Sequence, residues 1–462
     1  MKKIFSFFIV LNFSVIAFAG VKIHQLPKDM ASKRYNVHVN GQKADVFHAG
    51  MNVHFVSFDM DGTEPVEVKV ERRSSSNPFF WKGVAQIRPY SKNVKVHTDG
   101  RVATFKIEKP GQYILQQSEA TSAFDEPSVL IFANTPEQNI PSAEDKNVVY
   151  VPAGEHYANF DLKSGQTLYL ASGAVVYGSI NVFNQENVRV CGRGILLHNG
   201  MSSLEEDKGY LSKKNWHAVG MANAKNVEIN DIIIVNRARS WTIHTLNTFG
   251  FNAENMKIVV TCPENVNGDG IDWCGGGNSV IKNCFIRSAD DCFAFFTPHA
   301  AVDMYCHDKK SRAGSVKNIT IENCVLWPTL ANLFRMGFHY QDLQTENITL
   351  RNSDVIKIGH GYWMAYWAFF CSIAPSHTGN FHHKNYLIEN LTVESDAAIF
   401  GFNNNRAIYE NFTLRNVKIM GNPRPSRLAG ISRNIKLENV SFKGQNYTID
   451  NLPMEADSIY KK

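Results

Sequence analysis

The chain has 462 residues, of which 44% are hydrophobic and 20% charged, and its formal net charge is +5 at pH 7. A single hydrophobic core usually stops growing well below this length, so we expect two domains. The charge balance is close to neutral for this size and no block of basic residues stands out, which argues against nucleic acid as a partner.

The first 19 residues have the pattern of a secretory signal peptide. Lys2 and Lys3 precede an apolar run, and Ala17 and Ala19 form an A-x-A cleavage pattern at its end. A membrane anchor would need a longer apolar core than this one. We therefore expect residues 1–19 to be removed. The mature protein should be a soluble monomer without membrane insertion, located in the periplasm or secreted.

Residues 20–140 are predicted to form a β-sandwich domain. Segments such as "YNVHVNG", "VEVKVERR" and "RVATFKIEKPGQYILQ" alternate apolar and polar residues, with Gly, Asp and Pro at the breaks. This alternation is typical of strands with one buried face, and the breaks are typical of antiparallel sandwiches. The stretch "NTPEQNIPSAEDKN" is expected to be the linker, and residues 141–462 the catalytic domain.

From about residue 150 the sequence repeats the unit N-x-x-[I/L]-x-[N/D], followed by short apolar strands. Copies begin at Asn226, Asn278, Asn318, Asn347, Asn385, Asn411 and Asn434. The intervals between copies have the length of one coil of a right-handed parallel β-helix, with loops inserted where they are longer. Asparagine at a repeated corner can adopt a left-handed conformation and hydrogen-bond its copies on neighbouring coils. The predicted fold class is therefore all-β, a right-handed parallel β-helix preceded by a β-sandwich.

Some asparagines also fit the N-x-[S/T] glycosylation pattern, namely Asn318, Asn347, Asn390, Asn411 and Asn446. A glycan acceptor has no reason to fall in register with apolar strands, so the ladder interpretation is favoured.

All eight cysteines lie beyond residue 190. Export permits disulfides, but the spacings contain no zinc-type CxxC pair. Cys284 and Cys324 each follow an asparagine of the repeat, where a buried thiol is the commoner explanation. We expect mostly reduced cysteines in the core.

Four aspartates, Asp269, Asp272, Asp290 and Asp291, lie within the stretch 267–296, which is rich in apolar residues, glycine and asparagine. Counted from the repeated asparagines, Asp290 and Asp291 fall at a corner of one coil and Asp269 at the matching corner of the coil before. Neighbouring coils stack about 4.8 Å apart. Asp269, Asp290 and Asp291 are therefore expected to converge on one surface cleft.

Three carboxylates held together repel one another, so at least one retains a proton and its pKa rises. Glycoside hydrolysis needs both states: a protonated acid donates to the leaving oxygen, and an ionised partner activates water or attacks carbon. A "DG" turn or a "DD" pair alone is more often an ordinary surface feature. Their occurrence on consecutive coils of an exported chain favours catalysis.

These motifs resemble those of two related families of β-helix glycoside hydrolases. "NGDGID" resembles the N-T-D-G motif and "ADDC" the G-D-D motif of the polygalacturonases (family 28), and "RSWTIHTLN" resembles the segment that precedes them. The cysteine-free sandwich, followed by "PSVLIFANTPEQNIP", "VVYVPAGEHY" and "LYLASGAVVYGSI", is more similar to the dextranase and isopullulanase family (family 49). The resemblance implies an inverting hydrolase in which Asp290 is the acid and Asp269 and Asp291 position and deprotonate water.

The chain departs from the polygalacturonase pattern at two places. Asn332, in "ANLFRMG", stands where that family has the histidine of G-H-G-L-S-I-G, and no good match to its R-I-K motif is found. In that family the Arg and Lys of R-I-K bind galacturonate carboxylates. "LWPTLANLFRMGF" instead resembles the dextranase family, which acts on neutral glucans. We expect a neutral or unusual α-linked polysaccharide or oligosaccharide as substrate. His360, two repeats too late to be the family histidine, is expected to be a loop residue.

Further residues near the same corners are candidates for substrate binding, and we expect neither a metal nor a cofactor. They are Asn267, His244, Trp273, Asn332 and Arg335. The other candidate sugar-stacking side chains, for which core packing is the alternative, are Trp241, Phe296, Trp327, Trp363 and Trp367.

Two other functions compete with hydrolysis. A β-helix polysaccharide lyase would use a Lys or Arg base and often calcium on acidic carboxylates. A non-catalytic adhesin or carbohydrate-binding solenoid would bind without needing the aspartates.

Overall fold

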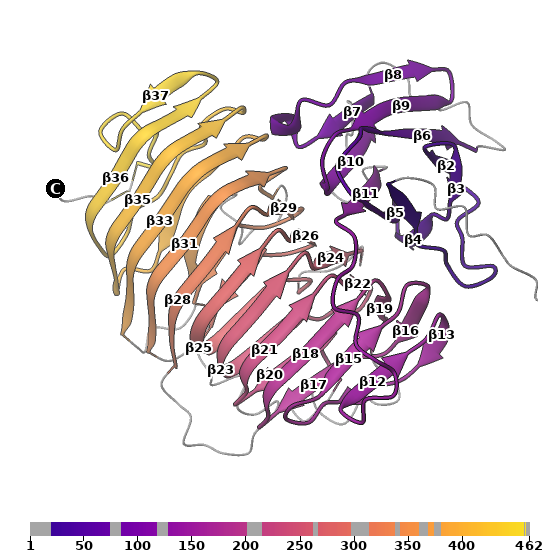
Figure 1. Cartoon of the computed structure of the whole chain (residues 1–462). Coiled ribbons are helices and arrows are strands. Elements are labelled where there is room, and N and C mark those ends of the chain that lie inside the picture. Colours follow the sequence, from indigo (N-terminus) through magenta and orange to yellow (C-terminus); the bar gives the residue numbers. More distant parts are fainter. Residues whose placement is uncertain are drawn as a thin grey trace, which may run out of the picture.

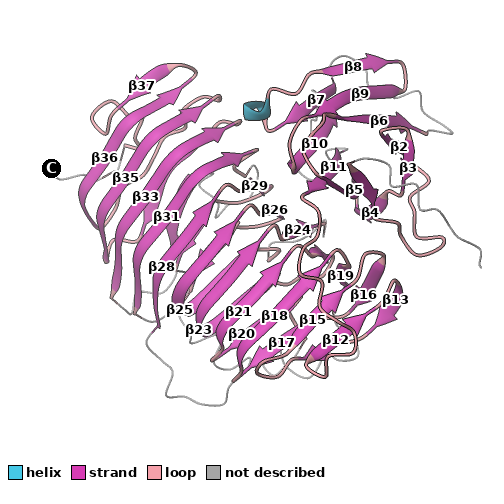
Figure 2. Cartoon of the chain, viewed as in Figure 1, coloured by secondary structure: helices cyan, strands magenta, loops and turns pink. Residues whose placement is uncertain are grey.

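A computed structural model describes residues 20–73, 85–117, 128–200, 215–261, 267–296, 314–337, 342–359, 368–373, 380–456 and 458. In these residues the regular secondary structure is all strand, apart from one short 3-10 helix, η1 (Tyr90–Lys92). Figures 1 and 2 show a smaller set of sheets beside a long curved stack of strands. No helix of the described part is long and apolar enough to cross a membrane. The expected signal peptide, Cys262, Cys306, His360, Trp363 and Trp367 lie outside the described residues.

The first part of the chain forms two facing sheets. The five-stranded sheet has the order β3-β2-β6-β9-β8, and the other has the order β1-β5-β11-β10-β7, with β4 also paired to β5. The strands are β1 (Val21–Ile23), β2 (Tyr35–Val39), β3 (Gln42–Ala44), β4 (Phe47–Gly50), β5 (Val53–Met60), β6 (Val66–Arg72), β7 (Ala85–Arg88), β8 (Val96–Asp99), β9 (Val102–Ile107), β10 (Gly111–Gln117) and β11 (Ser128–Asn134).

The residues that form the sandwich core alternate with exposed residues along the strands, as the sequence predicts. Val66, Val68 and Val70 of β6 are buried, whereas Glu67 and Lys69 between them are exposed. Within the described part of the sandwich the strand pairs are antiparallel except β5 and β11, which run parallel. The antiparallel sandwich is confirmed, with this one parallel pair.

The remaining strands form one parallel β-helix with three faces, which confirms the predicted fold class. The asparagine face contains β12 (Val148–Val151), β15 (Thr167–Leu170), β18 (Glu186–Gly192), β21 (Lys225–Asn230), the later halves of β23 (Ile243–Glu254) and β25 (Ile271–Lys282), β28 (Gly314–Glu322), β31 (Leu343–Val355), β33 (Phe381–Val393), β35 (Ala407–Ile419) and β36 (Ile431–Phe442), against which β37 (Gln445–Tyr447) turns back.

The other two faces are named for what they carry. The sandwich face contains β13 (Gly154–Tyr157), β16 (Ala174–Tyr177), β19 (Ile195–His198), β22 (Ile233–Asn236), β24 (Lys257–Val260), β26 (Phe285–Ser288) and β29 (Val325–Pro328). The aspartate face contains β14 (Phe160–Asp161), β17 (Ile180–Phe183), β20 (Val219–Ala222), the first halves of β23 and β25, β27 (Phe293–Phe295), β30 (Phe334–Met336), β32 (Ala368–Ile373) and β34 (Ala398–Asn403).

The repeated asparagines form hydrogen-bonded ladders at the corners. Asn347 Nδ2 donates to Asn318 Oδ1 over 2.8 Å, and Asn385 Nδ2 donates to Asn347 Oδ1 over 3.0 Å. Asn347 has a φ of 59°, in the left-handed region that asparagine tolerates better than most residues. The ladder prediction is confirmed, and the side chains of Asn318 and Asn347 are used in coil stacking.

The interior of the β-helix is a continuous apolar stack. Phe334 lies between Phe293 and Phe370, with ring centroids 5.5 and 5.6 Å away. The six described cysteines are buried and none of them forms a disulfide. This agrees with the expectation of reduced core cysteines for that part of the chain.

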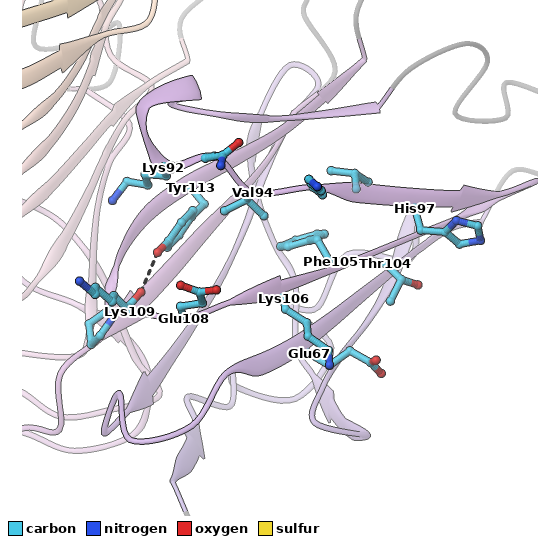
Figure 3. A pocket seen from close by; sticks show the side chains of 14 residues that line it. Glu67, Lys92, Val94, His97, Thr104, Phe105, Lys106, Glu108, Lys109 and Tyr113 are labelled. Carbon is cyan, nitrogen blue, oxygen red and sulfur yellow. Dashed lines mark hydrogen bonds between the residues drawn. The ribbon is translucent and has the colours of Figure 1, made fainter.

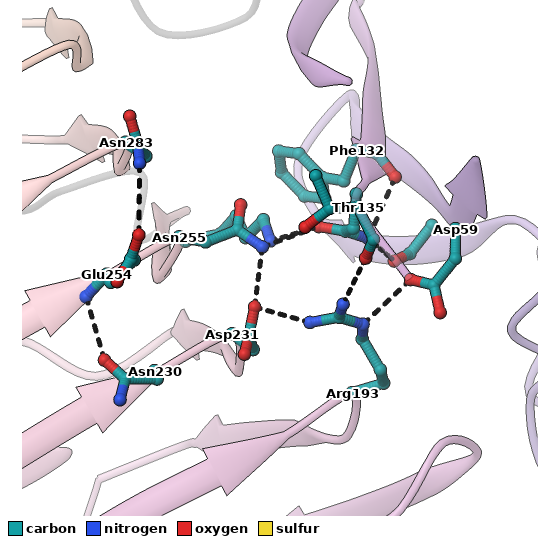
Figure 4. A network of polar contacts seen from close by, with 12 residues as sticks. Asp59, Phe132, Thr135, Arg193, Asn230, Asp231, Glu254, Asn255 and Asn283 are labelled. Carbon is teal, nitrogen blue, oxygen red and sulfur yellow. Dashed lines mark hydrogen bonds and ion pairs between the residues drawn. The ribbon is translucent and has the colours of Figure 1, made fainter. Parts of the chain in front are cut away.

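The sandwich packs against the sandwich face of the β-helix through an apolar layer and a buried polar network (Figure 4). Arg193 Nε donates to Asp59 Oδ1 over 2.9 Å, and its Nη1 lies 2.5 Å from Asp231 Oδ1. Lys257 Nζ donates to Asn134 Oδ1 over 2.5 Å. These contacts join the two domains and leave the aspartate face on another side of the β-helix.

Candidate active site

Backbone hydrogen bonds between coils place the aspartates in register. Asp269 immediately precedes Gly270, whose N–H donates to Asp291 O over 3.0 Å. A side chain at Gly270 would bring Cβ within 2.4 Å of Cys292 O, so glycine allows this close approach. Cys292 N–H in turn donates to Asn332 O over 3.0 Å. Asp269, Asp291 and Asn332 therefore occupy matching positions on three consecutive coils.

The structure brings the three predicted carboxylates together. One oxygen from each of Asp269, Asp290 and Asp291 lies within 4.8 Å of the others. Their exposed fractions are 3%, 7% and 2%. Three buried carboxyl groups this close together must retain protons or have a positive charge nearby to limit their mutual repulsion.

Asp291 has the positive partner. Its Oδ2 accepts a hydrogen bond from Arg335 Nε over 2.8 Å, and its Oδ1 accepts from the Asn332 N–H and Nδ2 over 2.9 and 2.8 Å. An ionised carboxylate is an acceptor only, and these three donors suit that form. The positive charge beside the cluster is thus supplied by a guanidinium of the chain itself.

Asp290 and Asp269 have the opposite electrostatic environment. Burial and, next, the charge of Asp291 raise the pKa of Asp290 to about 7, although Arg335 opposes the shift. Burial and then the charges of Asp272, Asp290 and Asp291 raise the pKa of Asp269 well above its usual range. Adjacent residues of one corner therefore differ, with a proton favoured on Asp290 and donors directed at Asp291.

Asp272 is a fourth carboxyl group, to which the sequence analysis assigned no role. It is fully buried, and within the described part of the chain neither of its carboxyl oxygens has a hydrogen-bond partner. Burial, followed by the charges of Asp291 and Asp290, raises its pKa well above the usual range. It pairs in register with His244 on the preceding coil and Ala294 on the following coil. Because Ile271 and Trp273 belong to the core, strand alternation directs Asp272 outward. The alternation is visible in the sequence, but the face on which it begins is set by the stacked coils.

Asn332 and Arg335, predicted to bind substrate, both contact Asp291. Asn332 is fully buried, and its Oδ1 accepts from the Ala368 N–H over 3.2 Å while its amide holds Asp291. Arg335 Nη1 donates to Cys371 Sγ over 3.4 Å. Both side chains hold Asp291 in place, and their predicted contact with substrate stays a prediction.

Trp273 does not fit its predicted role as a substrate-binding residue. It is fully buried in the β-helix core, with its ring 5.7 Å from that of Phe295 and 6.1 Å from that of Phe293. It exposes no face on which a sugar can stack. Trp327, at 1% exposure, is likewise buried, under the sandwich with Arg287 5.0 Å above its ring.

The other residues predicted to bind substrate are close to the aspartates, either in the sequence or on a neighbouring coil. His244 is fully buried, its Nε2 lies 3.2 Å from Cys274 Sγ, and burial lowers its pKa well below the usual value. Asn267 is partly exposed just before Asp269. Trp241 and Phe296 stack 5.0 Å apart in a small apolar cluster on the outside of the aspartate face.

No protein-family model matches this chain, and no curated protein sequence matches it. Among solved structures, Dex49A from Penicillium minioluteum superposes with a TM-score of 0.63 and 16% identity, over 94% of this chain and 93% of that one. A hyperthermoactive exopolygalacturonase from Thermotoga maritima aligns with a TM-score of 0.43 and 14% identity, over 65% and 85%. The adhesin PfbA of Streptococcus pneumoniae aligns with a TM-score of 0.33 and 14% identity, over 64% and 91%. At the level of fold, therefore, the resemblance to the dextranase family is confirmed: this chain shares the architecture of Dex49A, a sandwich followed by a β-helix.

Proposed function

We propose that the protein is an exported glycoside hydrolase that cleaves α-glycosidic bonds in a polysaccharide or oligosaccharide. The observation that supports this most is the contrast between two adjacent carboxyl groups. Asp290 has a pKa raised to about 7, whereas Asp291 accepts three hydrogen bonds, one of them from Arg335. Pairs of titratable groups with opposed environments are what acid and base roles require.

In the proposed reaction Asp290 donates its proton to the glycosidic oxygen as the bond to the anomeric carbon breaks. Asp291, held by Asn332 and Arg335, orients the attacking water together with Asp269. The proton of the water passes to this pair, which restores the charge of the site. Bound sugar and water replace the mutual contacts of the carboxyl groups.

From the resemblance to the two families, we predict that hydrolysis inverts the configuration of the anomeric carbon. The geometry of the ligand-free site does not supply this argument, since the carboxylate oxygens lie within 4.8 Å of one another. Inverting sites usually separate the two carboxyl groups by about 6.5–9.5 Å, and retaining sites by about 5–5.5 Å. Proton NMR of the first product decides: the inverted anomer is expected, and a retained anomer would reassign Asp269 or Asp291 as a nucleophile.

We propose a neutral glycan as the substrate. Arg335 is the one cation among the predicted substrate-binding residues, and its guanidinium contacts Asp291 and Cys371. A galacturonate carboxylate would compete with Asp291 for that charge. Efficient cleavage of polygalacturonate at ordinary salt would contradict this substrate assignment.

The test of the function is an assay of the purified mature protein on a glycan panel, with reducing ends and ultraviolet absorbance read together. New reducing ends without absorbance are expected, unchanged by a chelator. Absorbing products that disappear with the chelator would indicate the lyase alternative. Binding that survives the loss of all three aspartates, with no product, would indicate a non-catalytic solenoid. Export is tested separately, by N-terminal sequencing of the secreted protein, which is expected to begin at Gly20.

A further inference from the structure

A large open cavity lies on the sandwich domain, away from the aspartates (Figure 3). Its volume is about 920 Å³, and its lining comes from η1, the segment that leads to β8, the strands β6, β8, β9 and β10, and the turn between β9 and β10. Ligand sites in proteins commonly span about 300–1,000 Å³. The cavity is therefore large enough for an oligomer rather than a single small ion.

The inner wall of the cavity is held in place by contacts around Tyr113. The Tyr113 hydroxyl donates to Lys109 O over 2.7 Å, which ties β10 to the preceding turn. Lys92 Nζ lies 4.6 Å from the centre of the Tyr113 ring, a cation–π contact. Partly buried Val94 and Val96 add apolar lining and pack against the sandwich core. The wall thus combines apolar atoms with a fixed positive charge.

The rim is predominantly basic. Lys95, Lys106 and Lys109 are exposed, and the carboxylates among the lining residues are Glu67 and Glu108. Lys106 on β9 stands directly opposite Glu67 on β6, so those two charges offset one another in part. Lys95 and Lys109 form no ion pair within the described part of the chain. Together with Lys92 they give the cavity an excess of positive charge.

We propose that this cavity is an accessory binding site for a segment of an acidic glycan that bears carboxylate or sulfate groups. Lys95 and Lys109 contact the anionic groups, Lys92 sets a positive charge at the inner wall, and Val94 and Val96 contact the carbon faces of the sugar rings. The anionic character follows from the cavity alone, whereas the choice of a sugar chain rests on the proposed function. Through the domain contacts at Arg193 and Lys257, the site is joined to the β-helix that carries the aspartates.

Such a site would hold the enzyme on a matrix that contains acidic sugars while the aspartates act on another segment. Burial lowers the pKa of Lys92, and the nearby charge of Asp354 on β31 opposes that shift, so the Lys92 side of the cavity faces the β-helix. Glu394 at the end of β33 also accepts from Arg88 Nε over 2.5 Å beside η1. The cavity therefore borders the later coils, and a chain leaving it on that side would continue along the β-helix.

The experiment uses the full mature chain with Asp290→Asn, so that no probe is hydrolysed. Isothermal titration calorimetry compares three oligomers of equal length and backbone: dextran, carboxymethyl-dextran and dextran sulfate. We expect saturable binding of the two anionic forms, weakening as salt rises. The double variant Lys95→Glu/Lys109→Glu is expected to lower that affinity by roughly tenfold or more, since charge reversal replaces attraction by repulsion. Any binding of neutral dextran at the aspartates should be unaffected by it.

The matched control is Lys225→Glu/Lys436→Glu, which reverses two exposed lysines on β21 and β36 of the asparagine face. It changes the net charge equally and is expected to leave the affinity unchanged. An equal loss in the control, or no saturable binding of either anionic oligomer, would overturn the site. Equal binding of polyglutamate of the same charge would show that the cavity recognises negative charge and does not recognise the sugar. These outcomes do not depend on hydrolysis, so the proposed function stands or falls separately.

Discussion

At the scale of single residues, the site depends on which carboxyl group has a partner. Arg335 bonds to Asp291, and the neighbouring Asp290 receives only a weaker, longer-range stabilisation from that charge. Asp272 has no hydrogen-bond partner in the described chain and is fully buried, so its neutral form is favoured. Four similar side chains thus differ: Asp291 accepts hydrogen bonds from Arg335 and Asn332, and the other three have raised pKa values and tend to retain protons.

Asp290→Asn tests the acid role. We expect the variant to fold and to lose roughly 10²- to 10⁴-fold in turnover, the usual contribution of a general acid. In the parent protein kcat/KM should fall above about pH 7, where Asp290 loses its proton. Turnover and its pH profile are measured together with the melting temperature. A variant with normal turnover, or a parent whose activity still rises well above pH 7, would remove Asp290 from this role.

The same variant has a stability signature. The folded pKa of Asp290 is raised above its unfolded value, so the stability that its protonated form contributes is present at acid pH and lost as pH rises through about 7. Asparagine has no such dependence. Asp290→Asn is therefore expected to melt higher than the parent at pH 8, with the difference declining toward pH 4. An unchanged difference across that range would contradict the buried, protonated assignment.

Asp269 and Asp291 are expected to act as one unit. Asp269→Asn and Asp291→Asn should each be nearly as damaging as Asp290→Asn, and the double variant little worse than the worse single variant, because the losses of a cooperating site do not add. Single-turnover rates on one substrate provide the comparison. Losses that multiply would show that the two carboxylates do not hold a common water.

At the scale of elements, the asparagine ladder sets the spacing of the coils. Its members have a left-handed backbone conformation, and Asn347 hydrogen-bonds to Asn318 and Asn385 on the coils on either side. The corners keep consecutive strands in register, and that register carries through the coils to Asp269 and Asp291. The asparagine repeat at the corners therefore helps to position the carboxyl groups on the aspartate face.

Asn347→Ala and Asn347→Gly separate the two contributions of the ladder. Both lose the side-chain hydrogen bonds, but alanine also carries the left-handed penalty of about 1–2 kcal/mol that glycine avoids. We expect the alanine variant to be less stable than the glycine variant by about that amount. Urea denaturation provides the free energies of unfolding. Equal stabilities would show that the backbone conformation at this corner costs alanine nothing.

At the scale of the whole molecule, two domains share a buried polar interface on the sandwich face. Arg193 lies between Asp59 and Asp231, and Lys257 contacts Asn134 at the end of the last sandwich strand. Burial, with the nearby Arg193 charge, lowers the pKa of Lys257 to about 7. The charges of Asp231 and Asp59 oppose this shift, but they are shared with Arg193.

Lys257→Met tests this interface. The folded pKa of Lys257 is depressed, so its contribution to stability is complete above about pH 10.5, the usual value, and is lost as pH falls toward 7. The variant lacks that dependence, and we expect it to be at least as stable as the parent at pH 7. Melting temperatures of both proteins from pH 7 to 10 provide the test. A parallel pH dependence in the two proteins would show that Lys257 does not titrate there.

The sequence by itself determined the β-helix and the meeting of three aspartates, because both follow from local periodicity. A corner asparagine recurs once per coil, and counting from it aligns Asp269 with Asp291 before any coordinates are known. Strand alternation in the sandwich is equally local, and the burial of Val66, Val68 and Val70 follows from it.

Only the tertiary structure decided which side chains serve the site. Trp273 packs in the core because Ile271 and Trp273 alternate inward, which depends on where strand β25 begins after the corner. Arg335 bonds to Asp291, a partner set by contacts between coils that are 44 residues apart in sequence. Charge partners and the direction of a strand's first residue are properties of the stacked coils, and a repeat pattern read along the chain does not contain them.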